Sequence, residues 1–193
     1  MYLVLNTQYK TKATQGNHNN HIGVPLTLLS TPLDTEMLII EMGANHPGEI
    51  AFLSKIAKPD FGIITNIGKA HLKGFGGYEG VIKTKSELYN YIKKNGGELF
   101  VNEKDGLLLN LSKHIEQTNY GKHSQFLRAN PFVEFKYKET EISTKLIGAY
   151  NYSNLIAACC IGEYFGITIS NCKKAIESYT PTNNRYQIEK SKK

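Results

Sequence analysis

No apolar run in this 193-residue sequence is long enough to cross a bilayer, which takes about 20 consecutive apolar residues. The opening residues, MYLVLNTQYK, also lack the preceding basic residues and the small-residue cleavage site of a signal peptide. Hydrophobic residues nevertheless make up 40% of the chain, enough to bury a core, so disorder is excluded as its main state. We expect one globular domain, or one with a small appendage, that does not insert into a membrane.

Cysteine is scarce, with only three residues, so the chain has no even set from which to build a disulfide framework. Two of them, Cys159 and Cys160, are adjacent in an apolar stretch with helical periodicity, and the third is Cys172. This pattern favours reduced thiols in a cytoplasmic protein over disulfides in an exported one.

A concentrated positive charge is also missing, although the formal net charge is +6. The two arginines, Arg128 and Arg185, stand far apart, and three lysines lie at the C-terminal tail, Lys190, Lys192 and Lys193. Proteins that bind nucleic acid usually gather basic side chains on one face. We therefore expect no nucleic-acid partner, and a modest excess of lysine is equally suited to phosphorylated small molecules.

The first 121 residues alternate between short apolar runs and segments with helical spacing. The predicted strands are 37–42, 61–67, 98–102 and 117–121, and the predicted helices are 47–57, 79–94 and 105–114. Pro47 is typical of a first helical turn, and the pair Gly96-Gly97 of a helix end. Alternation of this kind predicts an α/β fold in which a mostly parallel sheet is flanked by helices.

The pattern of apolar and polar residues changes near residue 122. Three short runs with partial alternation, SQFLRA, FVEFKY and EISTKLI, are separated by turn residues and predict a small antiparallel β meander over about residues 122–148. Helical periodicity returns in NYSNLIAACCIGEYFG and SNCKKAIESY, and no internal repeat or low-complexity segment occurs. The chain starts like the end of a helix and finishes without a stop signal, so we expect both ends to be cut.

Polar residues follow two of the predicted strands, at the ends where open α/β sheets bind ligands. Glu41 comes at the end of IIE, and His71 closes TNIGKAH after the run IIT. A carboxylate and an imidazole at neighbouring strand ends can share a divalent cation, and nucleotide-bound Mg²⁺ takes one or two protein ligands. Taken singly, Glu41 is also explained as a helix-capping acid or a loop residue, and His71 as a structural histidine.

The segment QGNHNNHIGVPL, residues 15–26, concentrates amides, imidazoles and glycines ahead of an apolar helix start. Side-chain donors and a backbone that a ligand can approach closely favour a binding loop over a polar turn with a helix cap. The candidate ligand-binding residues are Asn17, Asn19, Asn20 and His21. His18 and His21 lack Cys or His partners at metal spacing, which argues against structural zinc.

Further polar candidates lie near the C-terminus and on the helix predicted over 79–94. Asn151 and Asn154 are spaced i, i+3 on a predicted first helical turn, which suits either a helix cap or recognition of a planar base edge. Arg185 is either a surface charge or a clamp for phosphate. Lys85 follows a Gly-rich connection, competes with Lys83 for any role, and is otherwise a solvated lysine.

No GxxxxGK[ST] phosphate loop occurs in the chain, so the residues alone predict an α/β domain with a magnesium–nucleotide or phosphate site. Longer motifs go further: in order they are GNHNNHIGVPLTLL, IIEMGANHPGEIAFLSKIAKPDFGIITNIGKAHLKGFG, EGVIKTKSEL, GAYNYSNLIAA and NNRYQ. This ordered set resembles the Mur ligase family from about residue 9 to the end, and the block 39–76 is highly specific. Within that family, the NxNNxIG loop resembles that of ligases adding D-alanyl-D-alanine to UDP-N-acetylmuramoyl-tripeptide in peptidoglycan synthesis.

The resemblance implies an ATP-dependent amide ligase of the bacterial cytoplasm, acting as a monomer. ATP phosphorylates the carboxylate of the growing peptide, and the amine of D-Ala-D-Ala attacks the acyl phosphate and releases phosphate. By the family pattern, Glu41 and His71 hold Mg²⁺, and Lys85 is a lysine whose carbamate, formed with CO₂, supports a second Mg²⁺. The same pattern assigns the adenine nucleotide to Asn151 and Asn154, the ATP phosphates to Arg185, and the peptide substrate to Asn17, Asn19, Asn20 and His21.

Two features depart from the family pattern. Position 150 is Tyr, where many members have His before the first asparagine. The family's phosphate loop and N-terminal UDP-binding domain would lie upstream of residue 1, and the C-terminal domain that closes over ATP would follow residue 193. We therefore expect residues 1–193 to be the central ATP-binding domain, a fragment that is inactive alone. The alternatives are a non-catalytic nucleotide- or peptide-binding module on the same fold, and a related amino-acid ligase.

Overall fold

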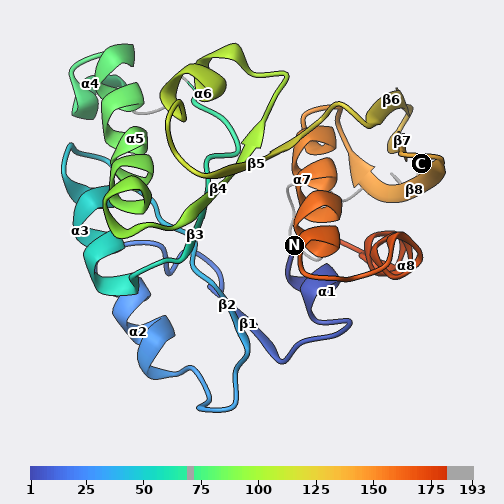
Figure 1. Cartoon of the computed structure of the whole chain (residues 1–193), viewed down its shortest axis with the longest axis horizontal. Coiled ribbons are helices and arrows are strands. Elements are labelled where there is room, and N and C mark those ends of the chain that lie inside the picture. Colours follow the sequence, from blue (N-terminus) through green and yellow to red (C-terminus); the bar gives the residue numbers. More distant parts are fainter. Residues whose placement is uncertain (69–71, 182–193) are drawn as a thin grey trace, which may run out of the picture. The chain divides into compact units, whose positions relative to one another are not determined.

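A computed structural model describes residues 1–68 and 72–181 (Figure 1), so the predicted site residues His71 and Arg185 lie outside the described residues. The chain divides into two compact units. The first comprises Tyr9–Tyr120 together with Tyr2, and the second comprises Met1, Leu3–Gln8 and the described residues from Gly121 onward. The first unit contains the predicted alternating segment, and the second contains the predicted meander.

Short parallel strands form two sheets in the first unit. They are β1 (Thr11–Ala13) paired with β2 (Met37–Ile39), and, in this order, β3 (Phe61–Ile63), β4 (Glu98–Asn102) and β5 (Gln117–Tyr120). In register, Gly62 lies opposite Leu99, and Phe100 lies opposite Thr118. The central strand β4 is the most deeply buried, with Leu99, Phe100 and Val101 at most 2% exposed. The α/β prediction with parallel strands is confirmed, and β1 is an addition that the sequence did not predict.

Helices cover these strands: α2 (Gly23–Leu29), α3 (Glu49–Ala57), α4 (Leu72–Phe75), α5 (Tyr78–Asn95) and α6 (Gly106–Leu111). Local sequence explains their ends. At the start of α6 the Asp105 carboxylate accepts hydrogen bonds from two backbone N–H groups of the first turn. Gly96, at φ 70°, ends α5 in the left-handed conformation that glycine adopts without strain. α3 begins at Glu49 rather than at the predicted Pro47, because Gly48 occupies the N-cap with φ 89°.

The apolar face of α5 builds the core of the first unit. Tyr89 and Ile92 of α5 are at most 1% exposed and belong to one buried cluster with Leu99 and Val101 of β4 and Leu108 of α6. On another side α5 packs against α3, which in turn packs against α2. α5 thus contacts the sheet on one side and α3 on another. Its polar residues Lys85 and Glu87 bond the segment after β3 and the segment after β2, respectively.

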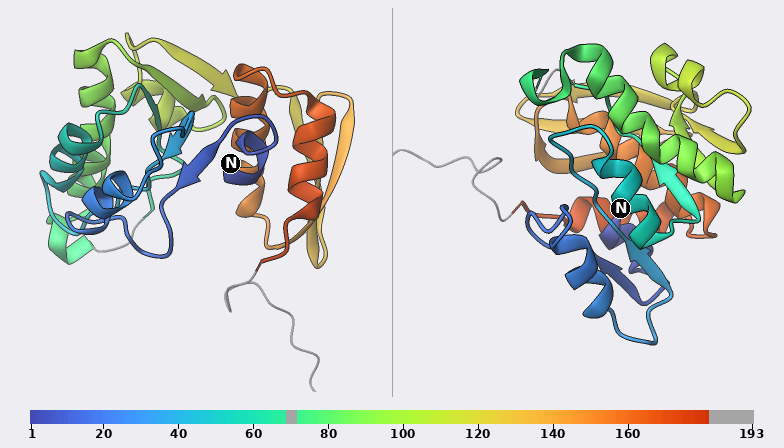
Figure 2. Two further views of the ribbon diagram at one scale, coloured as in Figure 1. Left: turned by 90° about the horizontal axis from the view of Figure 1, so that it is seen from below. Right: turned by 90° about the vertical axis from the view of Figure 1, so that its left-hand side faces the viewer.

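The second unit packs two helices against an antiparallel sheet. Its elements are α1 (Tyr2–Leu5), β6 (Ser124–Ala129), β7 (Phe132–Tyr137), β8 (Thr140–Ile147), α7 (Asn151–Tyr164) and α8 (Ile169–Ser178). β7 pairs with both β6 and β8, α7 lies on β7 and beside α8, and α8 contacts β8 (Figure 2). The meander and the two helices after it are therefore confirmed.

The cysteines contribute to the core of the second unit. Cys159 and Cys160 of α7 and Cys172 of α8 are free thiols and at most 7% exposed. Burial raises the pKa of the Cys172 thiol to about 11, which keeps it protonated and unreactive at neutral pH. Neither α7 nor any other helix in the described ranges has the length and apolar character to span a bilayer.

Candidate functional site

A cavity of about 780 Å³ opens in the first unit beside the amide-rich loop. Its lining residues come from that loop, from the segment after β2 and from α3; they are Asn17, Asn19, Asn20, His21, Gly43, Ala44, Asn45, Pro47, Gly48, Glu49, Phe52 and Leu53. The structure thus brings together on one cavity the four residues of the predicted binding loop, which the family resemblance assigns to the peptide substrate. Its volume is in the usual range of small-molecule sites, about 300–1,000 Å³.

Asn19 connects the amide-rich loop to the candidate metal ligand. Its Nδ2 donates a hydrogen bond to Glu41 Oε1 over 2.9 Å, and its backbone oxygen accepts one from the Gly43 N–H over 2.7 Å. The backbone N–H of Glu41 donates to Thr14 Oγ1 over 3.0 Å, so the residue is fixed at both backbone and side chain. The carboxylate remains exposed. In the described part of the chain this carboxylate bonds the Asn19 amide and no helix N-terminus, which favours the loop-residue explanation for Glu41 over a helix cap.

Asn20 stabilises its own loop. Its Oδ1 accepts hydrogen bonds from the N–H groups of Ile22 and Gly23, at 3.0 and 2.9 Å. Gly23 is required there, because a Cβ at this position would lie 2.3 Å from the Cα of His18. The polar-turn alternative for this segment is therefore correct for Asn20. Asn19 instead bonds Glu41 through its side-chain amide, and Asn17 and Asn19 both line the cavity.

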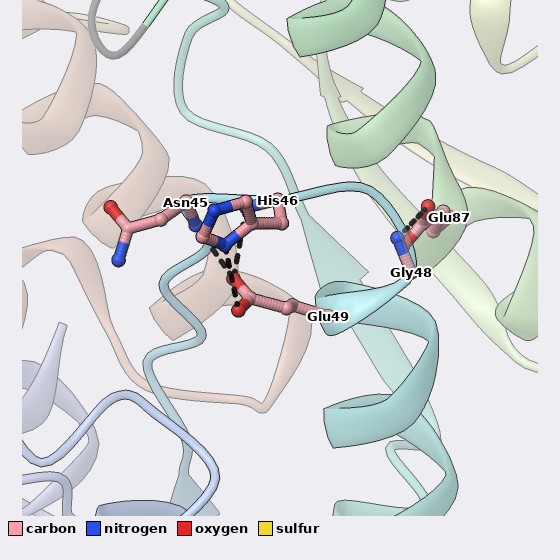
Figure 3. Close-up of polar contacts among 5 residues, drawn as sticks. All are labelled: Asn45, His46, Gly48, Glu49 and Glu87. Carbon is pink, nitrogen blue, oxygen red and sulfur yellow. Dashed lines mark hydrogen bonds and ion pairs between the residues drawn. The ribbon is translucent and has the colours of Figure 1, made fainter. Parts of the chain in front are cut away.

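Two glutamates that the sequence did not single out fix the far side of the cavity, residues 43–49, which we call the cavity wall. Glu49 Oε2 accepts hydrogen bonds from the N–H groups of Asn45 (2.6 Å) and His46 (3.1 Å), and the bond from Asn45 is the main cause of the lowered pKa of Glu49. Glu87 of α5 accepts from the N–H groups of Gly48 (2.8 Å) and Ala51 (2.9 Å) (Figure 3). An acid in the first turn of a predicted helix was the available signal for Glu49. Glu87 had none, because Gly48 lies 39 residues earlier.

Lys85 lies on α5, and its ammonium group reaches the segment after β3. The Nζ donates to the backbone oxygen of Asn66 over 2.8 Å. Burial lowers the pKa of Lys85, because desolvation disfavours the charged amine. Lys83, the competing candidate, is exposed. Lys85, whose amine is desolvated and hydrogen-bonded, is therefore a better candidate for a chemical role than the exposed Lys83.

In the second unit, Asn151 and Asn154 lie on the first turn of α7, as predicted, but neither caps it. The N-cap is Tyr150, whose side chain makes no capping hydrogen bond, and the N–H groups of Asn151 and Tyr152 donate to the backbone oxygens of Gly148 and Ala149. Asn151 is buried and donates from Nδ2 to the Ile147 oxygen over 2.8 Å, whereas Asn154 is exposed. The helix-cap alternative for this pair is wrong.

Comparison with known proteins accounts for these motifs. A family model described as the Mur ligase middle domain matches residues 1–162. The UDP-N-acetylmuramoyl-tripeptide–D-alanyl-D-alanine ligase of Bacillus subtilis (strain 168) is 33% identical over 99% of this chain and 43% of its own length. The Escherichia coli (strain K12) ligase of the same name is 32% identical over 86% of this chain and 40% of its own length. The chain thus spans less than half the length of these relatives.

Solved structures agree with the sequence relatives. MurF from Acinetobacter baumannii superposes with a TM-score of 0.87 at 28% identity, covering 98% of this chain and 44% of that protein. MurF ligase from Thermotoga maritima, in complex with ADP, superposes with a TM-score of 0.81 at 28% identity, covering 99% and 47%. The family match over residues 1–162, together with the fold and the ordered motifs, shows that this chain belongs to the Mur ligase family and corresponds to its middle domain.

Proposed function

We propose that residues 1–193 are the central, ATP-binding domain of an ATP-dependent ligase that adds D-Ala-D-Ala to UDP-N-acetylmuramoyl-tripeptide in peptidoglycan synthesis. The observation that carries the proposal is the cavity on which Asn17, Asn19, Asn20 and His21 meet, with Asn19 bonded to Glu41. The relatives from Bacillus subtilis and Escherichia coli, which match 99% and 86% of this chain, are named for that activity. Their similarity supports the same assignment here. We also propose a monomer that acts in the bacterial cytoplasm without nucleic acid, in keeping with the absence of a basic stripe in the sequence.

The proposed reaction has two steps. The terminal phosphoryl group of ATP moves to the tripeptide carboxylate, which gives an acyl phosphate and ADP. The amine of D-Ala-D-Ala then attacks the acyl carbon, an amide bond forms, the amine loses a proton, and inorganic phosphate leaves. The protein's part in such chemistry is to position the reactants and to neutralise charge as it moves between oxygens.

Glu41 is the described residue best suited to hold Mg²⁺. One carboxylate oxygen is oriented by Asn19 and the group is exposed, which suits a hard cation that prefers oxygen ligands. We propose that His71 completes the protein's contribution. Within residues 1–68 and 72–181 no group of three His, Cys, Asp or Glu side chains is placed to hold a metal ion. The remaining ligands would therefore be nucleotide phosphates and water, and the bound ion would neutralise phosphate charge.

Lys85 suits carbamylation because CO₂ reacts with the neutral amine. A lowered pKa raises the neutral fraction of Lys85 at any given pH. The hydrogen bond from Nζ to the Asn66 oxygen keeps the amine near the segment that continues toward position 71. The carbamate would convert a cation into an oxygen ligand for a second Mg²⁺.

For the nucleotide, we propose that Asn151 and Asn154 contact the adenine and that Arg185 contacts the phosphates. Asn154 is exposed, and Asn151 has its amide nitrogen fixed by the Ile147 oxygen, which orients its Oδ1. The Thermotoga maritima MurF ligase, similar over 99% of this chain, is in complex with ADP, which supports a nucleotide site in this family member too.

A chimaera tests the function. The segment of the Bacillus subtilis ligase that matches this chain is replaced by residues 1–193, and phosphate release is measured with ATP, UDP-N-acetylmuramoyl-tripeptide and D-Ala-D-Ala. We expect release that depends on both substrates in the chimaera and none from the isolated chain. Release with a single amino acid in place of D-Ala-D-Ala would indicate a related ligase. A folded chimaera without activity, together with ligand binding by the isolated chain, would indicate a non-catalytic module.

A further inference from the structure

Glu87 supplies the N-terminal cap of a helix to which it does not belong. The first N–H groups of an α-helix have no partner within the helix, and α3 has no side-chain cap of its own at Gly48. Glu87 reaches across from α5, with Oε1 bonded to the Gly48 N–H and Oε2 to the Ala51 N–H. Both bonds have a charged acceptor at the positive end of the helix dipole, which strengthens them.

These bonds also hold the cavity wall, because Gly48 belongs to it. Figure 3 shows the wall held at two points, by Glu49 beneath Asn45 and His46, and by Glu87 at Gly48. A third restraint comes from α4: a Cβ at Gly74 would lie 2.4 Å from the Asn45 oxygen, so the wall and α4 approach closely. The Asn45 side-chain amide points away from Glu49 and is exposed (Figure 3). Of these restraints, Glu87 alone extends from α5 to the wall.

The same helix carries Lys85, two residues before Glu87. Lys85 bonds the segment after β3 through Asn66, and Glu87 bonds the segment after β2 through Gly48. Residues two apart on a helix point to different sides, so Lys85 and Glu87 bond α5 to two different loops on different sides of the helix. The position of the cavity wall relative to the Lys85 amine therefore depends on Glu87.

We propose that Glu87 is a positioning residue that sets the cavity wall against Lys85 and thereby the affinity of the cavity for the peptide of the acceptor substrate. Glu87 does not line the cavity, so it acts through the wall and not by touching the ligand. The inference rests on the proposed function, in that the ligand is taken to be UDP-N-acetylmuramoyl-tripeptide.

The test is a graded series in the chimaeric ligase, which surrounds residues 1–193 with the rest of the Bacillus subtilis chain. Glu87 has two acceptor oxygens, Glu87→Gln keeps one, and Glu87→Ala keeps none. The matched control is Glu79→Gln, an exposed acid in the first turn of the same helix. UDP-N-acetylmuramoyl-tripeptide is titrated calorimetrically well below the melting temperature, and amide hydrogen exchange is followed at Gly48, Ala51 and the buried Tyr89.

We expect the dissociation constant for the tripeptide substrate to rise about tenfold in Glu87→Gln and further in Glu87→Ala. Exchange should accelerate at Gly48 and Ala51 and stay unchanged at Tyr89, and the control should match the wild type. Accelerated exchange with unchanged affinity, or equal acceleration at all three amides, would overturn the inference while leaving the proposed function intact. A chimaera with the unchanged residues 1–193 that binds no tripeptide substrate would overturn the peptide role of the cavity, and the inference with it. If Glu87→Ala does not fold, the affinity and the amide exchange rates of Glu87→Gln alone decide the test.

Discussion

Asn19 donates a hydrogen bond from its side-chain amide to the carboxylate of Glu41, with 2.9 Å between Nδ2 and Oε1. The two residues are 22 positions apart and come from motifs with different expected roles, one at the peptide substrate and one at the metal. The bond makes them a single unit, in which the amide that lines the cavity also orients the carboxylate. We therefore expect a ligand bound in the cavity to change the orientation of the Glu41 carboxylate.

Replacing Asn19 by alanine tests this link. Asn19→Ala frees the Glu41 carboxylate to rotate, so we expect the Mg²⁺ concentration needed for half-maximal ADP binding to rise roughly three- to tenfold. The free energy of unfolding should change by less than about 1 kcal/mol, because Asn19 is only half-buried. ADP titrations at several Mg²⁺ concentrations measure the effect. Asn17→Ala is the control, since Asn17 lines the same cavity without a bond to Glu41, and equal behaviour of the two variants would contradict the link.

Gly43 keeps Asn19 in place by lacking a side chain. A Cβ at this position would lie 2.8 Å from Asn19 Nδ2, closer than packed atoms approach. We expect Gly43→Ala to destabilise the chain by less than about 1 kcal/mol, as for Asn19→Ala, because the atoms in the way belong to the end of the Asn19 side chain, which can turn away at the loss of its bond to Glu41. Urea unfolding measures the change. At Gly106, in contrast, an added Cβ meets nothing within 4 Å, so Gly106→Ala should leave the free energy of unfolding unchanged or raise it slightly. A similar loss of stability in both variants would show that the contact with Asn19 is not its cause.

Much of the fold was predictable because local patterns specify it. The helix expected over 79–94 is α5, Tyr78–Asn95, since its periodic apolar residues and closing glycine pair act within a single segment. β1 was missed because three residues of mixed polarity, TKA, give no periodic signal, and only the pairing with β2 makes them a strand. The helix start at Pro47 was wrong by two residues because the left-handed Gly48 delays the first turn.

The candidate site was less predictable, because its contacts join distant segments. The amide loop, Glu41 and Lys85 were identified from residue types and family motifs. The bonds from Glu87 to α3 and from Lys85 to Asn66 cross 39 and 19 positions and depend on how α5 packs. No spacing rule pairs such residues. The capping role considered for Asn151 failed for a related reason, since its amide bonds the end of β8 instead of the helix start.

Lys85 should form a carbamate with CO₂. Burial lowers the pKa of Lys85, so its neutral amine is available at a lower pH than the ordinary value for lysine would allow. With ¹³C-bicarbonate, NMR of the wild-type chain should show a carbamate signal that weakens as the pH falls. Lys85→Gln should remove the signal, and the matched variant Lys83→Gln should retain it. The reverse assignment would contradict the role given to Lys85.

The catalytic importance of that carbamate is tested in the chimaeric ligase. Lys85→Ala removes the amine that forms the proposed oxygen ligand, so we expect activity to fall roughly 100-fold or more, as when a single group that stabilises transition-state charge is deleted. A short carboxylate such as acetate or formate, added at high concentration, has the size and charge to replace the carbamate and should restore part of the rate. The matched control, Lys83→Ala, should keep its rate and show no response to the carboxylate. Undiminished activity in Lys85→Ala would move the role to Lys83 or remove it, and loss without rescue would indicate that Lys85 acts as an amine through its bond to Asn66.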